Sequence, residues 1–350
     1  MSSFYWLRCL RAVLILAYLS TTIIPPLLLV FAAYVLVRPF NEGAYIRLAS
    51  AMQSSSSINL IFFLEVVLKI QIVVSGDGLP PPGESALVMS NHLTHDWVPM
   101  YMMSYRLGTL SYVRTVMKKV SQYVPLFGWA MWLGYWPFIS RSFDKDKKIL
   151  TDLFQRLAVH RIPIQLWMYP EGTRRSRKKI DACKTYAATK PELASCVGWD
   201  HVLIPKHRGF MLAYASLAKT VSSVYDVTLQ YEGWKGAASS SSRVPGFWDI
   251  ATGDPTLRHV VHVHIERLRM SDIAGDAQDD DRVEGKVKSF LIKRFWKKEQ
   301  LLRRFEQCGY FGPRRSPCLR GVPLSALSGP MLLWCVITVV FYYSFFWLVL

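Results

Sequence analysis

An uncharged apolar run near the N-terminus sets the first limit on how this chain folds. Residues 12–37 read AVLILAYLSTTIIPPLLLVFAAYVLV and lie between Arg11 and Arg38. At about 1.5 Å per residue, a helix of this length would reach roughly 39 Å, enough to cross the apolar core of a bilayer. Pro25 and Pro26 interrupt the run. We therefore keep two alternatives, a single kinked membrane span and a re-entrant hairpin that leaves and returns on one face.

A second uncharged run lies at residues 331–350. It is rich in Val, Phe, Tyr and Trp, and Arg314, Arg315 and Arg320 precede it on what should be the cytosolic side. Together the runs explain a hydrophobic content of 51% and predict an integral membrane protein. The net charge of +17 would also suit nucleic acid. Because no nucleic-acid-binding motif accompanies it, we expect anionic membrane lipids as partners and no nucleic acid.

Between these runs, short apolar segments of strand type alternate with segments of helical periodicity. Residues 54–57, all serine, should form a short loop, and the low-complexity residues 237–243 a surface loop. The alternation predicts an α/β domain. We expect strands at 69–74, 86–89, 134–141, 162–168, 201–204, 224–231 and 259–265, and helices at 58–68, 144–160, 210–222 and 283–305.

Polar residues follow four of the expected strands. In an open α/β sheet such loops converge on one edge, so we expect these groups to share a cleft. A base, several cations and a glycine-containing turn suit one task in particular, the activation of a hydroxyl beside a bound phosphate. The polar groups are His92 with Asp96 after 86–89, Arg141 at the end of 134–141, residues 171–174 after 162–168, and Pro205 with Lys206 after 201–204.

The first of these groups has the spacing of a catalytic dyad. His92 and Asp96 are four residues apart, so on a helical turn they share a face. The carboxylate would fix the imidazole tautomer and leave the other ring nitrogen free to take a proton from a hydroxyl. On its own the pattern fits equally well a hydrogen-bonded histidine near a helix N-terminus, and the other blocks decide between the two.

Four ordered blocks resemble the glycerolipid acyltransferase family, that is, the acylglycerophosphate (lysophosphatidate) acyltransferases and in particular their animal-type lysophosphatidate and lysocardiolipin branch. The resemblance covers about residues 60–310. It implies a glycerol-3-phosphate acyltransferase-like fold, a mixed sheet flanked by helices, with N- and C-terminal membrane segments. The blocks are NHLTHDW from residue 91, VPLFGW and PFISR from residues 124 and 137, YPEGTR from residue 169 and LIPKHRGF from residue 203.

The resemblance also implies a role for each matching residue. His92 would be the catalytic base and Asp96 its orienting partner. Lys118 matches a lysine that the family uses near the reacting carbonyl. The other matches divide into substrate-phosphate binding and active-site shaping, expected of Arg141, Glu171, Gly172, Thr173 and Arg174, and the acyl or acceptor pocket, expected of Pro205 and Lys206.

One departure from the family concerns the dyad itself. The family places four residues between its histidine and aspartate, whereas only three stand between His92 and Asp96. The pair remains within reach on a helical turn at a different angle. His95 is the alternative partner for the carboxylate.

The reaction implied is direct transfer of a fatty acyl chain from acyl-CoA, a co-substrate, to the free sn-2 hydroxyl of lysophosphatidate, which gives phosphatidate. No cofactor is implied, and no serine or cysteine nucleophile is needed. His262 and His264 share one strand face, but they lack a third ligand at zinc-site spacing, so we expect no metal. Other lysophospholipids, such as lysocardiolipin or lysophosphatidylinositol, are the alternative acceptors. A membrane scaffold with a decayed site is the alternative of another class.

The predicted organisation has three parts. Residues 1–54 would be the N-terminal membrane anchor, residues 55–310 the acyltransferase catalytic domain, and residues 311–350 a basic linker with a C-terminal transmembrane helix. We expect the endoplasmic reticulum membrane, with the mitochondrial outer membrane as the alternative, and an active site that faces the cytosol or its leaflet.

Overall fold

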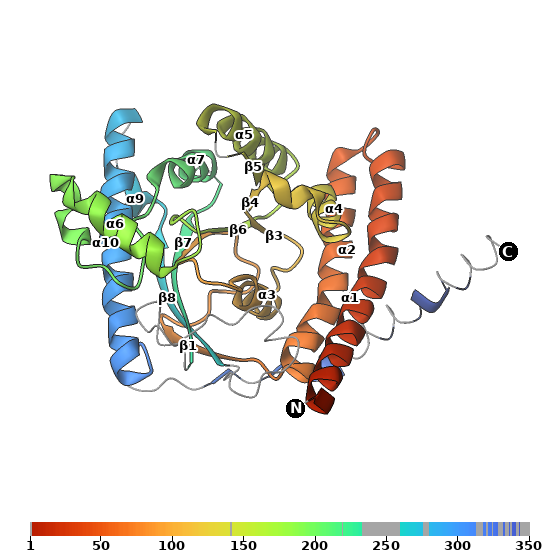
Figure 1. Ribbon diagram of the computed structural model, residues 1–350. Helices are drawn as coiled ribbons and strands as arrows, with labels where there is room; N and C mark the ends of the chain where they lie inside the picture. The colour runs from red at the N-terminus through yellow and green to blue at the C-terminus, as the bar shows by residue number, and fades with distance from the viewer. Residues whose placement is uncertain are drawn as a thin grey trace.

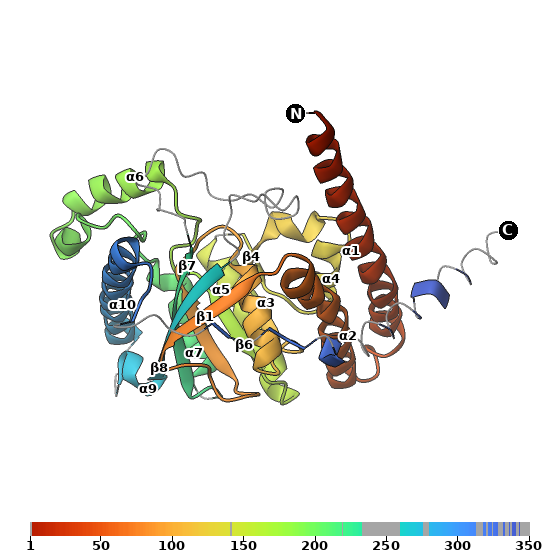
Figure 2. The ribbon, with the colours of Figure 1, turned by 90° about the horizontal axis from the view of Figure 1, so that it is seen from below.

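The structure is a computed structural model that describes residues 2–140, 142–218, 220–232, 260–275 and 280–312, and scattered positions between 318 and 343. Two long helices, α1 (Ser2–Leu36) and α2 (Glu42–Phe62), stand side by side at one flank of an α/β body, on the side away from α10 (Asp280–Cys308) (Figures 1 and 2). The Asn41 side chain accepts a hydrogen bond from the N–H of Ala44 at 2.9 Å and so caps α2.

A six-stranded sheet in the order β1-β8-β7-β2-β6-β3 forms the centre of the body. Neighbouring strands run parallel except β7 and β8, which are antiparallel. The expected mixed sheet flanked by helices is therefore confirmed. Its strands are β1 (Gln71–Gly76), β2 (Ala86–Ser90), β3 (Val113–Thr115), β6 (Gln165–Met168), β7 (Ser223–Tyr231) and β8 (Val260–Arg269), and a separate parallel pair consists of β4 (Met117–Lys118) and β5 (Phe138–Ile139).

Helices cover both faces of the sheet. Leu87 and Met89 of β2 pack into the cluster that contains residues of α5 (Phe143–Val159), α7 (His207–Leu217) and α10, whereas Val88 packs with residues of α3 (Trp97–Arg106). This alternation follows from the two-residue period of a strand. Because both faces are covered, β2 is apolar along most of its length. The remaining helical elements are η1 (Phe63–Val67), η2 (Lys119–Tyr123), α4 (Phe127–Leu133), α6 (Arg177–Ala188), η3 (Pro191–Cys196) and α9 (Ser271–Ala274).

Residues 12–36 of the N-terminal apolar run belong to one helix. Helix α1 continues through Pro25 and Pro26, and the chain reverses only at residues 37–41, before α2. Within the described part of the chain, no helix combines the length and the apolar character that a bilayer crossing requires. Of the second predicted membrane run, 331–350, only residues 332, 336, 338–340 and 343 are described.

The loop predicted at residues 54–57 is wrong, because α2 runs through all four serines. Serine hydroxyls compete with helical hydrogen bonding when they find backbone partners elsewhere. Here Ser56 and Ser57 donate instead to the carbonyl oxygen of Gln53, at 3.0 and 2.7 Å, one turn back in the same helix. The polar tract is thereby accommodated inside the helix.

Two further predictions need correction. Residues 201–204 do not form a strand, and the strand predicted at 134–141 is reduced to β5. Residues 173–176 are not part of a helix or strand, and α6 begins at Arg177. The predicted surface loop at 237–243 lies outside the described residues. The long basic helix is confirmed as α10, whose Val287, Leu291 and Phe295 are fully buried.

Candidate active site

His92 and Asp96 follow β2 at the carboxyl edge of the sheet. Nδ1 of His92 lies 2.5 Å from Oδ2 of Asp96. Because an ionised carboxylate only accepts hydrogen bonds, Nδ1 carries the proton, and Nε2 of the neutral ring keeps its lone pair for an incoming hydroxyl. The side chain of His92 is 24% exposed, whereas that of Asp96 is 5% exposed. The pair has the arrangement of an accessible base held by a buried carboxylate.

A tight turn makes the short spacing work. His95 has a φ of 70°, in the left-handed region that residues other than glycine rarely adopt. The second oxygen of Asp96 accepts a hydrogen bond from the N–H of Leu93 at 2.9 Å, inside the same turn. The ring of His95 lies edge-on to Trp97, with 6.3 Å between ring centroids. The structure thus pairs Asp96 with His92 rather than His95, although only three residues intervene.

The backbone of His92 is held on both sides by the turn that follows β6. Its N–H donates to Oε2 of Glu171 at 2.6 Å, and its carbonyl oxygen accepts from the N–H of Arg175 at 3.1 Å. Oε1 of Glu171 accepts a further hydrogen bond from the N–H of Leu203 at 2.8 Å. Glu171 is only 2% exposed, and burial raises the pKa of its carboxyl to about 7. Of the two roles expected for Glu171, its position favours shaping the active site over contact with phosphate.

Three other residues shape the surroundings of the dyad, and the sequence prediction missed them. The ring of Tyr169 stacks on His92, with 4.7 Å between centroids and 23° between planes. The hydroxyl of Tyr231 donates to the carbonyl oxygen of His95 at 2.9 Å. The amide of buried Asn91 donates to and accepts from the backbone of Leu229, at 3.0 and 2.8 Å, and so fixes the end of β2 to β7.

Sequence signals existed for two of these three residues. Tyr169 opens the YPEGTR block, and Asn91 directly precedes His92 in the first block.

Burial raises the pKa values of Tyr169 and Tyr231 well above 10, so both phenols stay neutral beside Asp96. Because these two phenols are neutral, the Asp96 carboxylate is the negatively charged partner of the imidazole.

Residues 205–206 reach the same turn, although no strand precedes them. The N–H of Lys206 donates to the carbonyl oxygen of Pro170 at 2.7 Å. Gly172 has a φ of +67°, and a Cβ atom placed there would meet Cδ of Lys206 at 3.4 Å. The positive φ favours glycine at this position, and the Lys206 side chain lies beside it. Thr173 takes part through its hydroxyl, which accepts a hydrogen bond from Nζ of Lys179 at 2.6 Å.

Three of the cations predicted for the site, Lys118, Arg174 and Lys206, are exposed. We call them the outer cations. None of their side chains has a hydrogen-bond or ion-pair partner within the described part of the chain. Lys118 belongs to the β4–β5 pair, opposite Ile139. Arg141 lies outside the described residues, and Pro205, beside Lys206, is buried.

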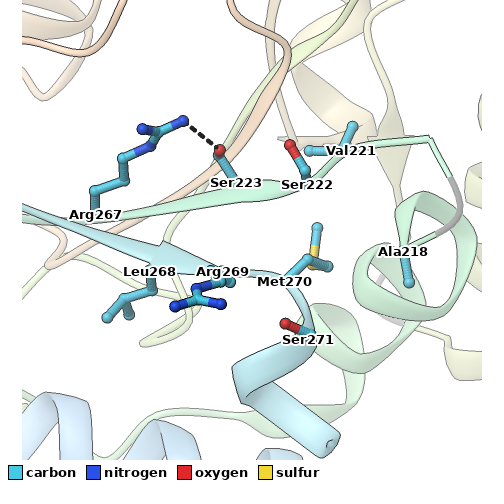
Figure 3. A pocket seen from close by; sticks show the side chains of 9 residues that line it. All are labelled: Ala218, Val221, Ser222, Ser223, Arg267, Leu268, Arg269, Met270 and Ser271. Atoms are coloured by element: carbon cyan, nitrogen blue, oxygen red, sulfur yellow. Dashed lines mark hydrogen bonds between the residues drawn. The ribbon is translucent and has the colours of Figure 1, made fainter.

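A hollow among the described residues lies away from this edge of the sheet. A pocket of about 610 Å³ lies where β7 begins and β8 ends, and Arg267 and Ser223 are among the side chains that line it (Figure 3). Ser223 pairs with Ala86, at the start of β2, whereas His92 follows the end of that strand. The pocket is therefore on the opposite edge of the sheet from the dyad. Over the residues described, no group of three or more metal-ligating side chains occurs.

Comparisons with known proteins converge on one family. Residues 71–230 match the Acyltransferase family model. The chain is 31% identical over 250 residues to 1-acyl-sn-glycerol-3-phosphate acyltransferase 2 of Brassica oleracea, a match that covers 70% of this chain and 60% of the relative. It is 27% identical over 259 residues to lysocardiolipin acyltransferase 1 of Danio rerio, with 70% and 58% covered. The chain thus spans about three fifths of the length of these relatives.

One solved structure is also similar, the 1-acyl-sn-glycerophosphate (LPA) acyltransferase PlsC from Thermotoga maritima. The match has a TM-score of 0.39 and 15% sequence identity, and it covers 84% of this chain and 98% of that one. The matched family segment begins with β1 and ends within β7. It contains the dyad, the 171–175 turn and residues 205–206. The match to the Acyltransferase family model thus covers the part of the chain that holds the candidate site.

Proposed function

We propose that this chain is an acyl-CoA-dependent 1-acyl-sn-glycerol-3-phosphate O-acyltransferase, which transfers a fatty acyl chain to the sn-2 hydroxyl of lysophosphatidate. The observation that supports the proposal most strongly is the 2.5 Å contact between His92 and Asp96, beside the turn at Glu171. The relative from Brassica oleracea, named for 1-acyl-sn-glycerol-3-phosphate, supports the choice of acceptor.

The dyad would act as a general base. Nε2 of His92 takes the proton from the acceptor hydroxyl as that oxygen attacks the thioester carbonyl. Asp96 keeps the ring in the required tautomer and stabilises the imidazolium that forms. When the tetrahedral intermediate collapses, the C–S bond breaks and the CoA thiolate takes the proton from His92. The products are phosphatidate and free CoA, and no acyl-enzyme forms on the way.

The outer cations would bind the charged parts of the substrates. Arg174, together with Arg141, would hold the acceptor phosphate, because a guanidinium can donate two parallel hydrogen bonds to phosphate oxygens. Lys118 would meet the oxyanion that develops on the thioester carbonyl. Lys206 and Pro205 would line the side of the pocket that receives the acyl chain or the acceptor.

The reaction would take place at a membrane, with the endoplasmic reticulum as the expected location and the site toward the cytosol. Helix α1 exposes large apolar side chains, among them Leu29, Phe31 and Leu36, at 51%, 54% and 69%. Apolar surface gathered in this way is unfavourable in water and suits contact with lipid. Binding to anionic vesicles, measured by co-sedimentation, tests this part. Equal recovery of the chain in the supernatant with and without vesicles would contradict it.

Replacement of the base tests the proposed chemistry. His92→Ala should lower kcat by about a thousandfold with labelled oleoyl-CoA and lysophosphatidate, because general-base catalysis contributes factors of this order. The matched control is His95→Asn, since asparagine tolerates the left-handed backbone of that position and should keep activity within a few-fold. Unchanged acyl transfer by His92→Ala would remove the proposed base. If the wild-type chain transferred an acyl group to no lysophospholipid, the alternative of a membrane scaffold with a decayed site would be favoured.

The acceptor needs a test of its own. The relative named lysocardiolipin acyltransferase 1 favours a second candidate, the same reaction on lysocardiolipin. A panel of lysophosphatidate, lysocardiolipin and lysophosphatidylinositol at equal concentration should give the highest kcat/KM for lysophosphatidate. A higher value for either of the others would change the acceptor but not the reaction.

A further inference from the structure

The matched family segment ends within β7, yet α10, far beyond it, reaches toward the active site. Glu299 of α10 is fully buried, and its carboxylate contacts the first two residues of the segment 200–203. Oε1 accepts from the N–H of Asp200 at 3.1 Å, and Oε2 accepts from the N–H of His201 at 2.7 Å. Nδ1 of His201 lies 2.9 Å from Oε1. One carboxylate of α10 therefore holds two successive backbone N–H groups and a side chain of this segment.

Two hydrogen-bonded routes connect residues 200–203 to the backbone of His92. In the first, the N–H of Leu203 donates to Glu171 at 2.8 Å, and Glu171 accepts the N–H of His92 at 2.6 Å. In the second, the guanidinium of Arg175 donates to the carbonyl oxygen of His201, and the N–H of Arg175 donates to the carbonyl oxygen of His92 at 3.1 Å. The two routes meet His92 at its N–H and at its C=O.

These contacts also explain why residues 201–204 do not form a strand. The N–H of His201 donates to Glu299 of α10, and the N–H of Leu203 donates to Glu171 in the 171–175 turn. These carboxylates take the place of the carbonyl oxygens that a neighbouring strand would offer. All the participating groups are buried or nearly so: Glu299 at 0%, Glu171 at 2%, Arg175 at 6% and His201 at 7% exposure. In a water-poor environment such bonds hold their partners in one geometry.

We propose that Glu299 is a positioning residue for His92, acting through His201 and the backbone of residues 200–203. The proposal rests on the function proposed above and extends its site to a helix outside the matched family segment. Glu299 touches no reacting atom. Loss of its carboxylate would let residues 200–203 shift. Because Glu171 and Arg175 are hydrogen-bonded to this segment, they would shift with it, and the imidazole of His92 would be displaced in turn. Small displacements of a catalytic base slow the reaction without changing how the acceptor phosphate binds.

The test compares two variants of α10. Glu299→Gln removes the charge but keeps the size. Arg294→Gln is the matched control, because Arg294 also ties α10 to the body, through Asp226 at 2.5 Å and Glu266 at 2.6 Å on β7 and β8. For the full chain in detergent micelles, thermal midpoint, kcat and KM for lysophosphatidate are measured. Glu299→Gln should lower kcat by roughly ten- to a hundredfold, with KM within about twofold of wild type. Arg294→Gln should lower the thermal midpoint but leave kcat per folded molecule unchanged.

A second measurement does not depend on acyl transfer. Diethyl pyrocarbonate modifies imidazole nitrogens, and peptide mass spectrometry gives the rate constant for His92 alone. This rate constant should change in Glu299→Gln and stay at the wild-type value in Arg294→Gln. If Glu299→Gln does not fold, Glu299→Asp withdraws the carboxylate by about 1.5 Å while keeping its charge, and the same changes are expected.

The outcomes separate this proposal from the function on which it rests. A wild-type kcat and a wild-type His92 modification rate in the folded Glu299 variant would overturn the positioning role. A loss of kcat matched by Arg294→Gln would overturn it as well. If the wild-type chain transfers no acyl group to any acceptor, the proposed function fails, and the modification rates alone decide whether Glu299 positions His92.

Discussion

Two sets of groups surround the proposed reaction centre, and they differ in how the protein treats them. The anchored group consists of His92, Asp96, Glu171 and Arg175. Hydrogen bonds to other groups of the protein hold each of them through its backbone or its side chain. The outer cations, by contrast, are exposed, and their side chains lack partners within the described part of the chain. The anchored group has its geometry fixed before any substrate arrives, whereas the outer cations leave their hydrogen-bonding capacity for a ligand.

This difference implies that the two sets control different kinetic constants. Groups whose position is fixed in advance act mainly in the transition state, so their loss should lower kcat. An outer cation that binds a non-reacting phosphate, as proposed for Arg174, contributes to substrate binding, so its loss should mainly raise KM. Lys118 is the exception among the outer cations, because at the developing oxyanion it would act in the transition state. Replacements in each set can separate the two.

The largest effect is expected for Asp96→Asn. Asparagine keeps the shape, but its amide can present an N–H to Nδ1 of His92 and so favour the wrong tautomer, with Nε2 protonated. We expect kcat to fall by about a thousandfold and KM for lysophosphatidate to stay within about threefold. The measurement is steady-state acyl transfer with labelled oleoyl-CoA. A large rise in KM with kcat preserved would show that Asp96 belongs with the binding groups.

The sequence predicted the dyad because its determinants are local. His92 and Asp96 lie within one turn, and the apolar residues of β2 before them have the pattern of a buried strand. The strand β6 and the helices α5 and α10 were predicted for the same reason. Long-range partners were beyond prediction. Glu299 lies more than a hundred residues after Glu171 in the chain, and nothing in its neighbours shows that it faces residues 200–203.

Errors in the predicted elements have a related cause. The serines at 54–57 suggested a loop because free hydroxyls favour turns, but the outcome depended on whether the preceding helical turn offered an acceptor. Residues 201–204 suggested a strand because they are apolar, but their N–H groups bind Glu299 and Glu171. Composition describes what a segment prefers, whereas tertiary partners decide which preference is satisfied.

Glu171, in the anchored group, should make the stability of the folded protein depend on pH. Burial raises the pKa of Glu171 to about 7, from an ordinary value of 4.5. The folded protein therefore holds this proton more tightly than the unfolded chain, and its stability should decline as the pH rises from 4.5 to about 7. The decline is at most about 3.5 kcal/mol, at about 1.4 kcal/mol per pKa unit. Denaturant unfolding at several pH values should show a smaller decline in Glu171→Gln.

The control for this experiment comes from the outer cations. Lys206 is exposed and lies outside the anchored group, so Lys206→Gln should keep the wild-type dependence of stability on pH. If Glu171→Gln and wild type lose the same free energy of unfolding between pH 4.5 and 7, Glu171 is ionised across the range despite its burial. The two backbone N–H groups that it accepts would then outweigh desolvation.

The smallest effect is expected for the outer cations themselves, and Arg174 shows it best. A charge-assisted hydrogen bond contributes about 1.5–3 kcal/mol, so Arg174→Gln should raise KM for lysophosphatidate by roughly ten- to a hundred-and-fiftyfold and leave kcat within about threefold. Arg177→Gln is the matched control, because Arg177 is also exposed but pairs with Asp181 at 3.2 Å. It should leave both constants near the wild-type values. If KM for acyl-CoA rises in Arg174→Gln while that for lysophosphatidate does not, this arginine contacts the donor. The outer cations would then divide between two phosphate-bearing substrates, while the anchored group would still serve one reaction centre.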